Sequence, residues 1–160
     1  MLTKSLAEPG MFFSRMSPDM GFAKPFGYLL ISSIFFSAAS AMANFSANPF
    51  VFIGLYITNA VVMTLISAGL GYILIFALKG GRNVAFSHVF SIYAISSGTT
   101  LLAAWIPYFI IFTEPWKWWL IGTGMTKSCR LSCIQAIVVI GVSIGMLVCA
   151  FQFVLPLTLL

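Results

Sequence analysis

The sequence predicts an all-α membrane protein, a bundle of five transmembrane helices preceded by a short interfacial segment. Two observations support this prediction. Of the 160 residues, 61% are hydrophobic and 7% are charged, whereas soluble domains have about 45–50% apolar and about 25% charged residues. The apolar residues also form uncharged blocks of the length that a helix needs to cross a bilayer, about 20 residues. This composition excludes a soluble enzyme, a secreted disulfide-stabilised domain and a disordered polar tail.

The chain divides into an N-terminal cytoplasmic or interfacial segment, residues 1–25, and a transmembrane bundle, residues 26–160. Turn-forming and basic residues separate the apolar blocks of the bundle. The clearest separator is residues 79–83 (KGGRN), because paired glycines end helices and cations favour the membrane surface. The five predicted spans are approximately 26–44, 50–78, 85–105, 107–125 and 131–155. An alternative with four spans merges the third and fourth blocks into one long broken element.

The basic residues predict the orientation of the chain. Cytoplasmic loops of membrane proteins carry an excess of Lys and Arg. With five spans, seven basic residues lie on the same side as the N-terminus: Lys4, Arg15, Lys24, Lys79, Arg82, Lys127 and Arg130. The opposite side has none, and Lys117, inside the fourth block, is assigned to neither side. The sequence therefore predicts a cytoplasmic N-terminus and a C-terminus on the opposite side.

Aromatic and methionine side chains alternate with polar ones before the first span. Such a stretch is typical of a segment in the membrane interface, with its rings at the acyl boundary and its cations among the headgroups. Phe12, Phe13 and Arg15 are therefore predicted interfacial anchors. The alternative is an ordered loop that packs under the bundle.

Glu114 and Lys117 are the most informative polar residues, because both fall inside the fourth apolar block. Their i,i+3 spacing places them on one helix face, where they can pair. Each charge alone within a span costs roughly 2.5–3.5 kcal/mol on insertion scales, so an intramembrane pair indicates a functional site. The favoured alternative places them at the outer interface, because tryptophans mark the membrane–water boundary and three lie nearby: Trp116, Trp118 and Trp119.

Two other features of the sequence concern packing and cofactors. Gly141 and Gly145 form a GxxxG pattern, which lets two helix backbones approach closely, and packing within the bundle is favoured over packing against another chain. The single histidine, His88, excludes a bis-histidine haem within one chain, and an interfacial role is favoured over a ligand role. The three cysteines lack a CxxC pattern, so we expect neither a metal nor another cofactor.

Several segments of the chain resemble one known family. Residues 12–16 (FFSRM) and 21–26 (GFAKPF) lead into the first span, residues 85–94 (AFSHVFSIYA) open the third, and residues 119–127 (WLIGTGMTK) precede 131–136 (LSCIQA). This order resembles the Yip-domain family, membrane proteins named for their interaction with Ypt/Rab GTPases, and in particular its short prokaryotic members. The resemblance implies a five-span helical bundle with a cytoplasmic N-terminus and no established catalytic residues.

The sequence predicts a protein that is not an enzyme. It has one histidine and three carboxylates, and no metalloprotease, serine-hydrolase or phosphate-binding motif. We expect a non-catalytic accessory or scaffold subunit of a larger membrane assembly, or a membrane organiser. Its expected partners are the lipid bilayer and other membrane protein subunits, without nucleic acid. The alternative function is a small homo-oligomeric transporter or channel that uses Glu114.

Overall fold

The computed structural model describes residues 9–16, 21–43, 48–78, 84–106 and 108–157, which form helices and the short segments that flank them. The helices in these residues are α2 (Pro9–Ser14), α3 (Ala23–Ala43), α4 (Pro49–Leu78), α5 (Phe86–Ala104), α6 (Ile110–Ser128) and α7 (Cys133–Leu157). The separator at residues 79–83 lies outside the described residues. Each predicted span thus coincides with one helix, which confirms the all-α class.

Three of these helices are long and apolar enough to cross a membrane: α3, α4 and the Cys133–Ala150 part of α7. This finding fits a multi-pass membrane protein, but it does not confirm five transmembrane helices. The predicted spans at 85–105 and 107–125 form α5 and α6, which fall outside this set. The physical reason is their composition, because α5 is rich in Ser and Thr and α6 contains Glu114, Lys117 and Lys127.

The third and fourth blocks form two separate helices, so the alternative that merges them into one element is wrong. α5 ends at Ala104 and α6 begins at Ile110. Between them Tyr108 has a positive φ of 64°, a left-handed conformation that interrupts a helix. The two helices then pack against each other. α6 continues through Pro115, an internal proline near its N-terminal end.

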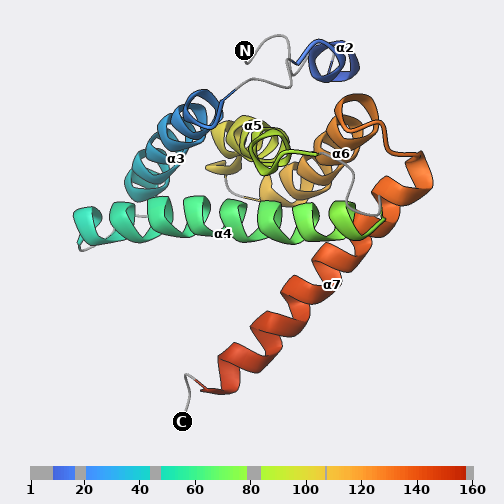
Figure 1. Cartoon of the computed structure of the whole chain (residues 1–160). Helices are drawn as coiled ribbons and strands as arrows, with labels where there is room; N and C mark the ends of the chain where they lie inside the picture. Colours follow the sequence, from blue (N-terminus) through green and yellow to red (C-terminus); the bar gives the residue numbers. More distant parts are fainter. Residues whose placement is uncertain (1–8, 17–20, 44–47, 79–83, 107, 158–160) are drawn as a thin grey trace.

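α5 is the central helix of the bundle. It packs against α3, α4 and α6, which lie around it in Figure 1. All thirteen residues from His88 to Thr100 are buried, so the helix has no outward face over this length. Small side chains make this enclosure possible: a Cβ built at Gly98 would lie 2.7 Å from a ring carbon of Tyr28 in α3. The neighbouring backbones can therefore approach α5 closely.

Hydroxyl groups in this interior bond mainly to their own helices. Ser33 and Ser37 donate to carbonyls four residues earlier at 2.7 Å, and Thr99 donates to Ile95 O at 2.8 Å. Because the Thr99 proton is used in this way, Tyr28 Oη donates the 3.1 Å hydrogen bond between Tyr28 and Thr99. This bond joins α3 to α5. Bonded hydroxyls avoid the cost of burying an unpaired polar group.

The helix α2 packs against α6, at one end of the bundle in Figure 1. Phe13 is only 1% exposed, and its ring would lie 3.3 Å from a Cβ built at Gly124. Phe13 is therefore a core residue, and its prediction as an interfacial anchor is wrong. The missing side chain at Gly124 provides the space for its ring.

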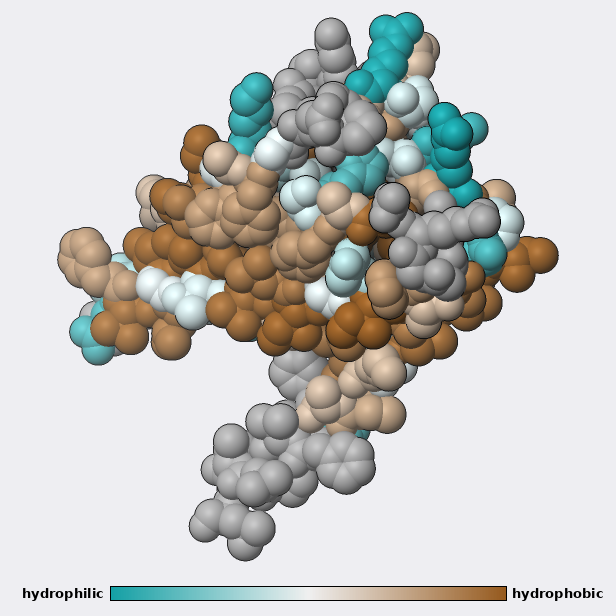
Figure 2. Space-filling view, in the orientation of Figure 1, coloured by the Kyte–Doolittle hydropathy of each residue, from teal (hydrophilic) through white to brown (hydrophobic). Residues whose placement is uncertain are grey.

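The C-terminal part of α7 extends away from the other helices (Figure 1). The first turn of α7 is stabilised by a reciprocal capping box, in which Ser132 N donates to Gln135 Oε1 at 3.1 Å and Gln135 N donates to Ser132 Oγ at 3.2 Å. Buried positions on α7 then follow one stripe: Ala136, Val139 and Ser143. Figure 2 shows a hydrophobic band along α4, with hydrophilic side chains gathered toward the α2 end of the molecule.

Two glycines of α4 provide a test of this packing. A methyl group at Gly71 would collide with the Tyr93 hydroxyl of α5, whereas Gly69 has open space. We expect Gly71→Ala to destabilise the protein by about 1–3 kcal/mol, because the clash outweighs the better helix propensity of alanine. Gly69→Ala is the matched control and should be neutral or mildly stabilising. Thermal unfolding of both variants in detergent checks this, and equal melting temperatures would contradict the packing of α5 on α4.

Candidate functional site

The candidate site is a cavity of about 420 Å³ between α4, α5, α6 and α7. Its volume is within the range of small-molecule sites, about 300–1,000 Å³. The side chains that carry polar or charged groups into its lining are Asn59, Thr64, Ser67, Tyr93, Ser97, Thr100, Thr113, Glu114 and Lys117. The cavity therefore gathers polar groups from three helices of a chain that is 7% charged.

Glu114 and Lys117 form the ion pair that their spacing predicts. Lys117 Nζ lies 2.7 Å from Glu114 Oε1 and 2.6 Å from Oε2. The Lys117 side chain is 22% exposed and that of Glu114 is 49% exposed. Lys117 Nζ also lies 5.4 Å from the centre of the Trp118 ring, a distance at which the ring face attracts a cation. The pair thus combines a partly buried cation with a carboxylate open to the cavity.

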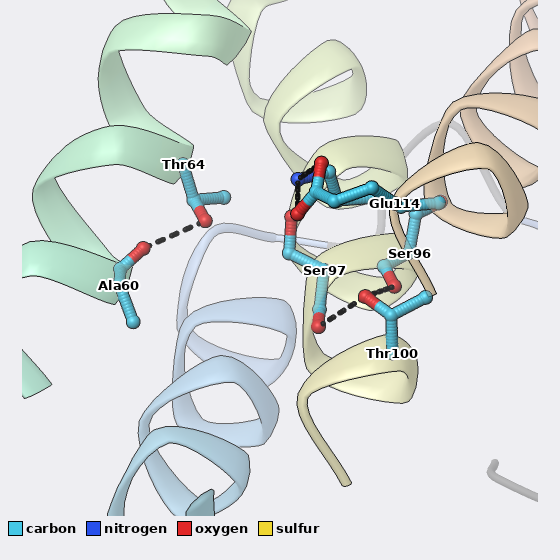
Figure 3. A network of polar contacts seen from close by, with 7 residues as sticks. Ala60, Thr64, Ser96, Ser97, Thr100 and Glu114 are labelled. Carbon is cyan, nitrogen blue, oxygen red and sulfur yellow. Dashed lines mark hydrogen bonds and ion pairs between the residues drawn. The ribbon is translucent and has the colours of Figure 1, made fainter. Parts of the chain in front are cut away.

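Figure 3 shows Glu114 together with hydroxyl residues of the neighbouring helices, Thr64 of α4 and Ser97 and Thr100 of α5. The Glu114 side chain extends from α6 into the space between Thr64 of α4 and Ser97 of α5. Thr64 Oγ1 donates to Ala60 O at 2.8 Å, and Thr100 Oγ1 lies 3.2 Å from Ser96 O and 3.0 Å from Ser97 O. The lone pairs of these hydroxyl oxygens stay available, so the wall can still accept hydrogen bonds.

The ion pair adds little to the stability of the fold. Pairs at i,i+3 or i,i+4 stabilise a helix by about 0.2–0.5 kcal/mol, and the exposure of Glu114 weakens the attraction further. Burial of one large apolar side chain contributes about 1.5–3 kcal/mol. An apolar pair at these positions would therefore stabilise α6 at least as well. The contribution to stability therefore does not explain why charged residues stand at these positions.

The predicted tryptophan anchors divide between two environments. Trp118 lines the polar cavity. Trp116 and Trp119 are exposed, and their ring centres lie 5.1 Å apart. Trp116 also lines a second cavity of about 210 Å³ with Phe109 and Phe112. The anchor role of the three tryptophans stays a prediction. Of the N-terminal anchors, Phe12 is half-buried and Arg15 is exposed.

Gly141 and Gly145 do not pack within the bundle. A Cβ built at either position meets no heavy atom within 4 Å, so the favoured packing inside the chain is wrong for this pair. The reason is their face of α7, which lies opposite to the buried stripe of Ala136, Val139 and Ser143. Their close approach to a second chain stays a prediction.

His88 lies apart from the cavity. Its Nε2 is 2.6 Å from Ser128 Oγ, a bond that joins the start of α5 to the end of α6. His88 is buried, and its Nδ1 has no hydrogen-bond partner among the described residues. Within the same residues, no group of three His, Cys, Asp or Glu side chains is placed to hold a metal ion. In the structure His88 therefore connects the start of α5 to the end of α6.

The sequence did not reveal that hydroxyl residues of α4 and α5 line the cavity, or that Tyr93 does so too. Back-bonded serines and threonines occur in many membrane helices, so composition alone did not distinguish Thr64 and Ser97 from other hydroxyl residues. Tyr93 lines the cavity and is 1% exposed, but nothing in its local sequence signals this position. The capping box at Ser132 was detectable, because Ser-x-x-Gln at the start of an apolar block is a known helix signal.

A double-mutant cycle tests the ion pair. We expect Glu114→Gln and Lys117→Met each to lower the melting temperature in detergent slightly, because each removes one partner of a partly exposed ion pair. The decrease in the double variant should be smaller than the sum of the two single decreases. The expected coupling energy is about 0.2–0.5 kcal/mol, the range of helix pairs at this spacing. Additive effects would contradict an ion pair in this environment.

No family model matches this chain, and no curated protein or solved structure matches it either. The resemblance to the Yip-domain family therefore stays a prediction. The feature of the chain that bears most directly on its function is the cavity lined by Glu114 and Lys117.

Proposed function

We propose that this chain is a small homo-oligomeric transporter or channel whose binding site is the Glu114–Lys117 cavity. The observation that carries the proposal is the position of the pair: its charges line a cavity between four helices. Ionisable groups that face a cavity inside membrane proteins mark solute pathways. The hydroxyl groups of Thr64 and Ser97 supply additional polar contacts for a bound molecule.

We further propose that all five long helices cross the membrane, with the N-terminus in the cytoplasm and the C-terminus on the opposite side. The enclosure of α5 supports this topology. A helix surrounded by protein does not contact lipid, so its serines and threonines carry no penalty for lipid exposure. At 19 residues, α5 and α6 each extend for roughly 28 Å at 1.5 Å per residue, close to the thickness of the hydrocarbon core.

A second candidate function is that of an accessory or scaffold subunit, as the Yip-domain resemblance implies. The observation that favours it is the outer surface of α7, where Gly141 and Gly145 lie in open space beside exposed apolar residues. A second helix would pack closely on such a surface. Under this function the partners are other membrane protein subunits.

Labelling of single cysteines tests the topology. With five spans, position 108 lies outside the cell and position 127 inside. If only α3, α4 and α7 crossed, both positions would lie inside. In a variant without the native cysteines, we therefore expect Tyr108→Cys to react with a membrane-impermeant maleimide on intact cells, and Lys127→Cys to react only after lysis. Protection of both positions on intact cells would contradict the five-span proposal.

Native mass spectrometry after gentle solubilisation distinguishes the two functions. As a transporter, the chain should be recovered as a symmetric oligomer of one polypeptide. Glu114→Gln should preserve this oligomer, because the side chain faces the cavity and not the outer surface of α7. Recovery in a stoichiometric complex with other membrane proteins would contradict the transporter proposal and support the accessory subunit.

A further inference from the structure

The cavity has two chemically different walls. Its charged and hydroxyl groups come from α4, α5 and α6, which also contribute apolar side chains, whereas α7 contributes only apolar ones: Ile144, Leu147 and Val148. A molecule that fills the cavity has to present a polar group to one wall and hydrocarbon to the other. We propose that its ligand is a phospholipid with a zwitterionic headgroup that bears a primary ammonium group. This inference rests on the proposed function, because it names the class of substrate for the same cavity.

Because the charges of Glu114 and Lys117 cancel, the site favours a zwitterionic ligand over one with a net charge. Glu114 and Lys117 neutralise each other, yet both keep unused bonding capacity. An ammonium group has three N–H donors and a carboxylate has about four lone-pair sites, of which the two short contacts use only part. The phosphate of a lipid can accept from Lys117 while its ammonium donates to Glu114. A lipid with net negative charge would gain the first contact and be repelled by the carboxylate.

Trp118 argues for a primary over a quaternary ammonium group. Quaternary ammonium headgroups are recognised by open aromatic faces. In this cavity the Trp118 ring already lies beside Lys117 Nζ, at 5.4 Å from the ring centre. The remaining acceptor for a cation is the Glu114 carboxylate, which is 49% exposed. A primary ammonium donates hydrogen bonds to such an acceptor, and a quaternary one has no N–H to donate.

The apolar wall continues onto the outside of the molecule. Ile144 and Val148 line the cavity and are also exposed on the surface of α7. Since α7 leaves the bundle in this direction (Figure 1), acyl chains can pass from the cavity along α7 to the lipid phase. The headgroup would thus lie between the helices and the chains would stay in the bilayer. A water-soluble zwitterion would leave this wall without a partner.

Native mass spectrometry of the purified full chain in detergent tests the proposal with defined probes. Palmitoyl-oleoyl phosphatidylethanolamine is titrated against phosphatidylcholine and phosphatidylglycerol with the same chains, and against phosphoethanolamine, which has no chains. We expect phosphatidylethanolamine to bind at least about tenfold more tightly than each of the others, because hydrogen bonds to charged groups are worth about one such factor or more.

Two pairs of variants locate the site. Glu114→Gln leaves Lys117 unpaired, so this variant should bind phosphatidylglycerol more tightly than phosphatidylethanolamine. A misfolded protein cannot show such a gain in affinity. Lys127→Gln, on an exposed part of the same helix, should keep the original preference. Val148→Trp should block binding by filling the apolar side of the cavity, and Val142→Trp, which is exposed on α7 but outside the cavity lining, should not.

Each of the other outcomes contradicts one part of the proposal. Equal affinity for phosphoethanolamine would show that the ligand is water-soluble, and equal affinity for phosphatidylcholine would exclude recognition of the ammonium group. An unchanged preference in Glu114→Gln would place the lipid elsewhere. The same spectra separate this inference from the proposed function: a homo-oligomer without lipid preference overturns only the inference, and lipid preference within a mixed complex overturns only the transporter.

Discussion

The enclosure of α5 on all sides is the constraint on which the rest of the structure depends. A helix that contacts α3, α4 and α6 at once needs small side chains wherever a neighbour crosses it. Gly98 of α5 makes room for Tyr28, and Gly71 of α4 makes room for Tyr93. The hydroxyls of α5 return largely to carbonyls of their own helix, so a polar sequence can occupy the centre of the bundle at small cost. One of these residues, Thr100, also lines the cavity, together with Ser97.

The significance of Glu114 and Lys117 depends on the polar groups that line the same cavity. As an isolated pair on a helix they would contribute little to stability. Beside Thr64 and Ser97 they become part of a neutral site with several unused donors and acceptors. The low polarity of the surrounding helices strengthens such contacts relative to water. A transporter with a lipid substrate would use this neutrality to select a zwitterion, and the apolar side of α7 to accommodate the chains.

The helical blocks and the ion pair were predictable from the sequence because both depend on local spacing. Apolar runs and turn residues place five helices, and i,i+3 spacing places two charges on one face. The failures concern contacts between distant segments. Phe13 has the sequence context of an interfacial anchor, but the absent side chain of Gly124 lets it enter the core. Gly141 and Gly145 have a packing pattern, but they lie in open space on the face of α7 opposite to its buried residues.

The sequence by itself determined the all-helical class, the three helices apolar enough to cross a membrane, and the pairing of Glu114 with Lys117. These properties follow from composition and from helix periodicity, which act over a few residues. Only the tertiary structure decided that α5 is central, that hydroxyl residues of α4 and α5 line the same cavity as the ion pair, and that α7 contributes apolar side chains to that cavity. Such contacts join residues far apart in the chain, and helix packing sets them through the shapes of the facing surfaces.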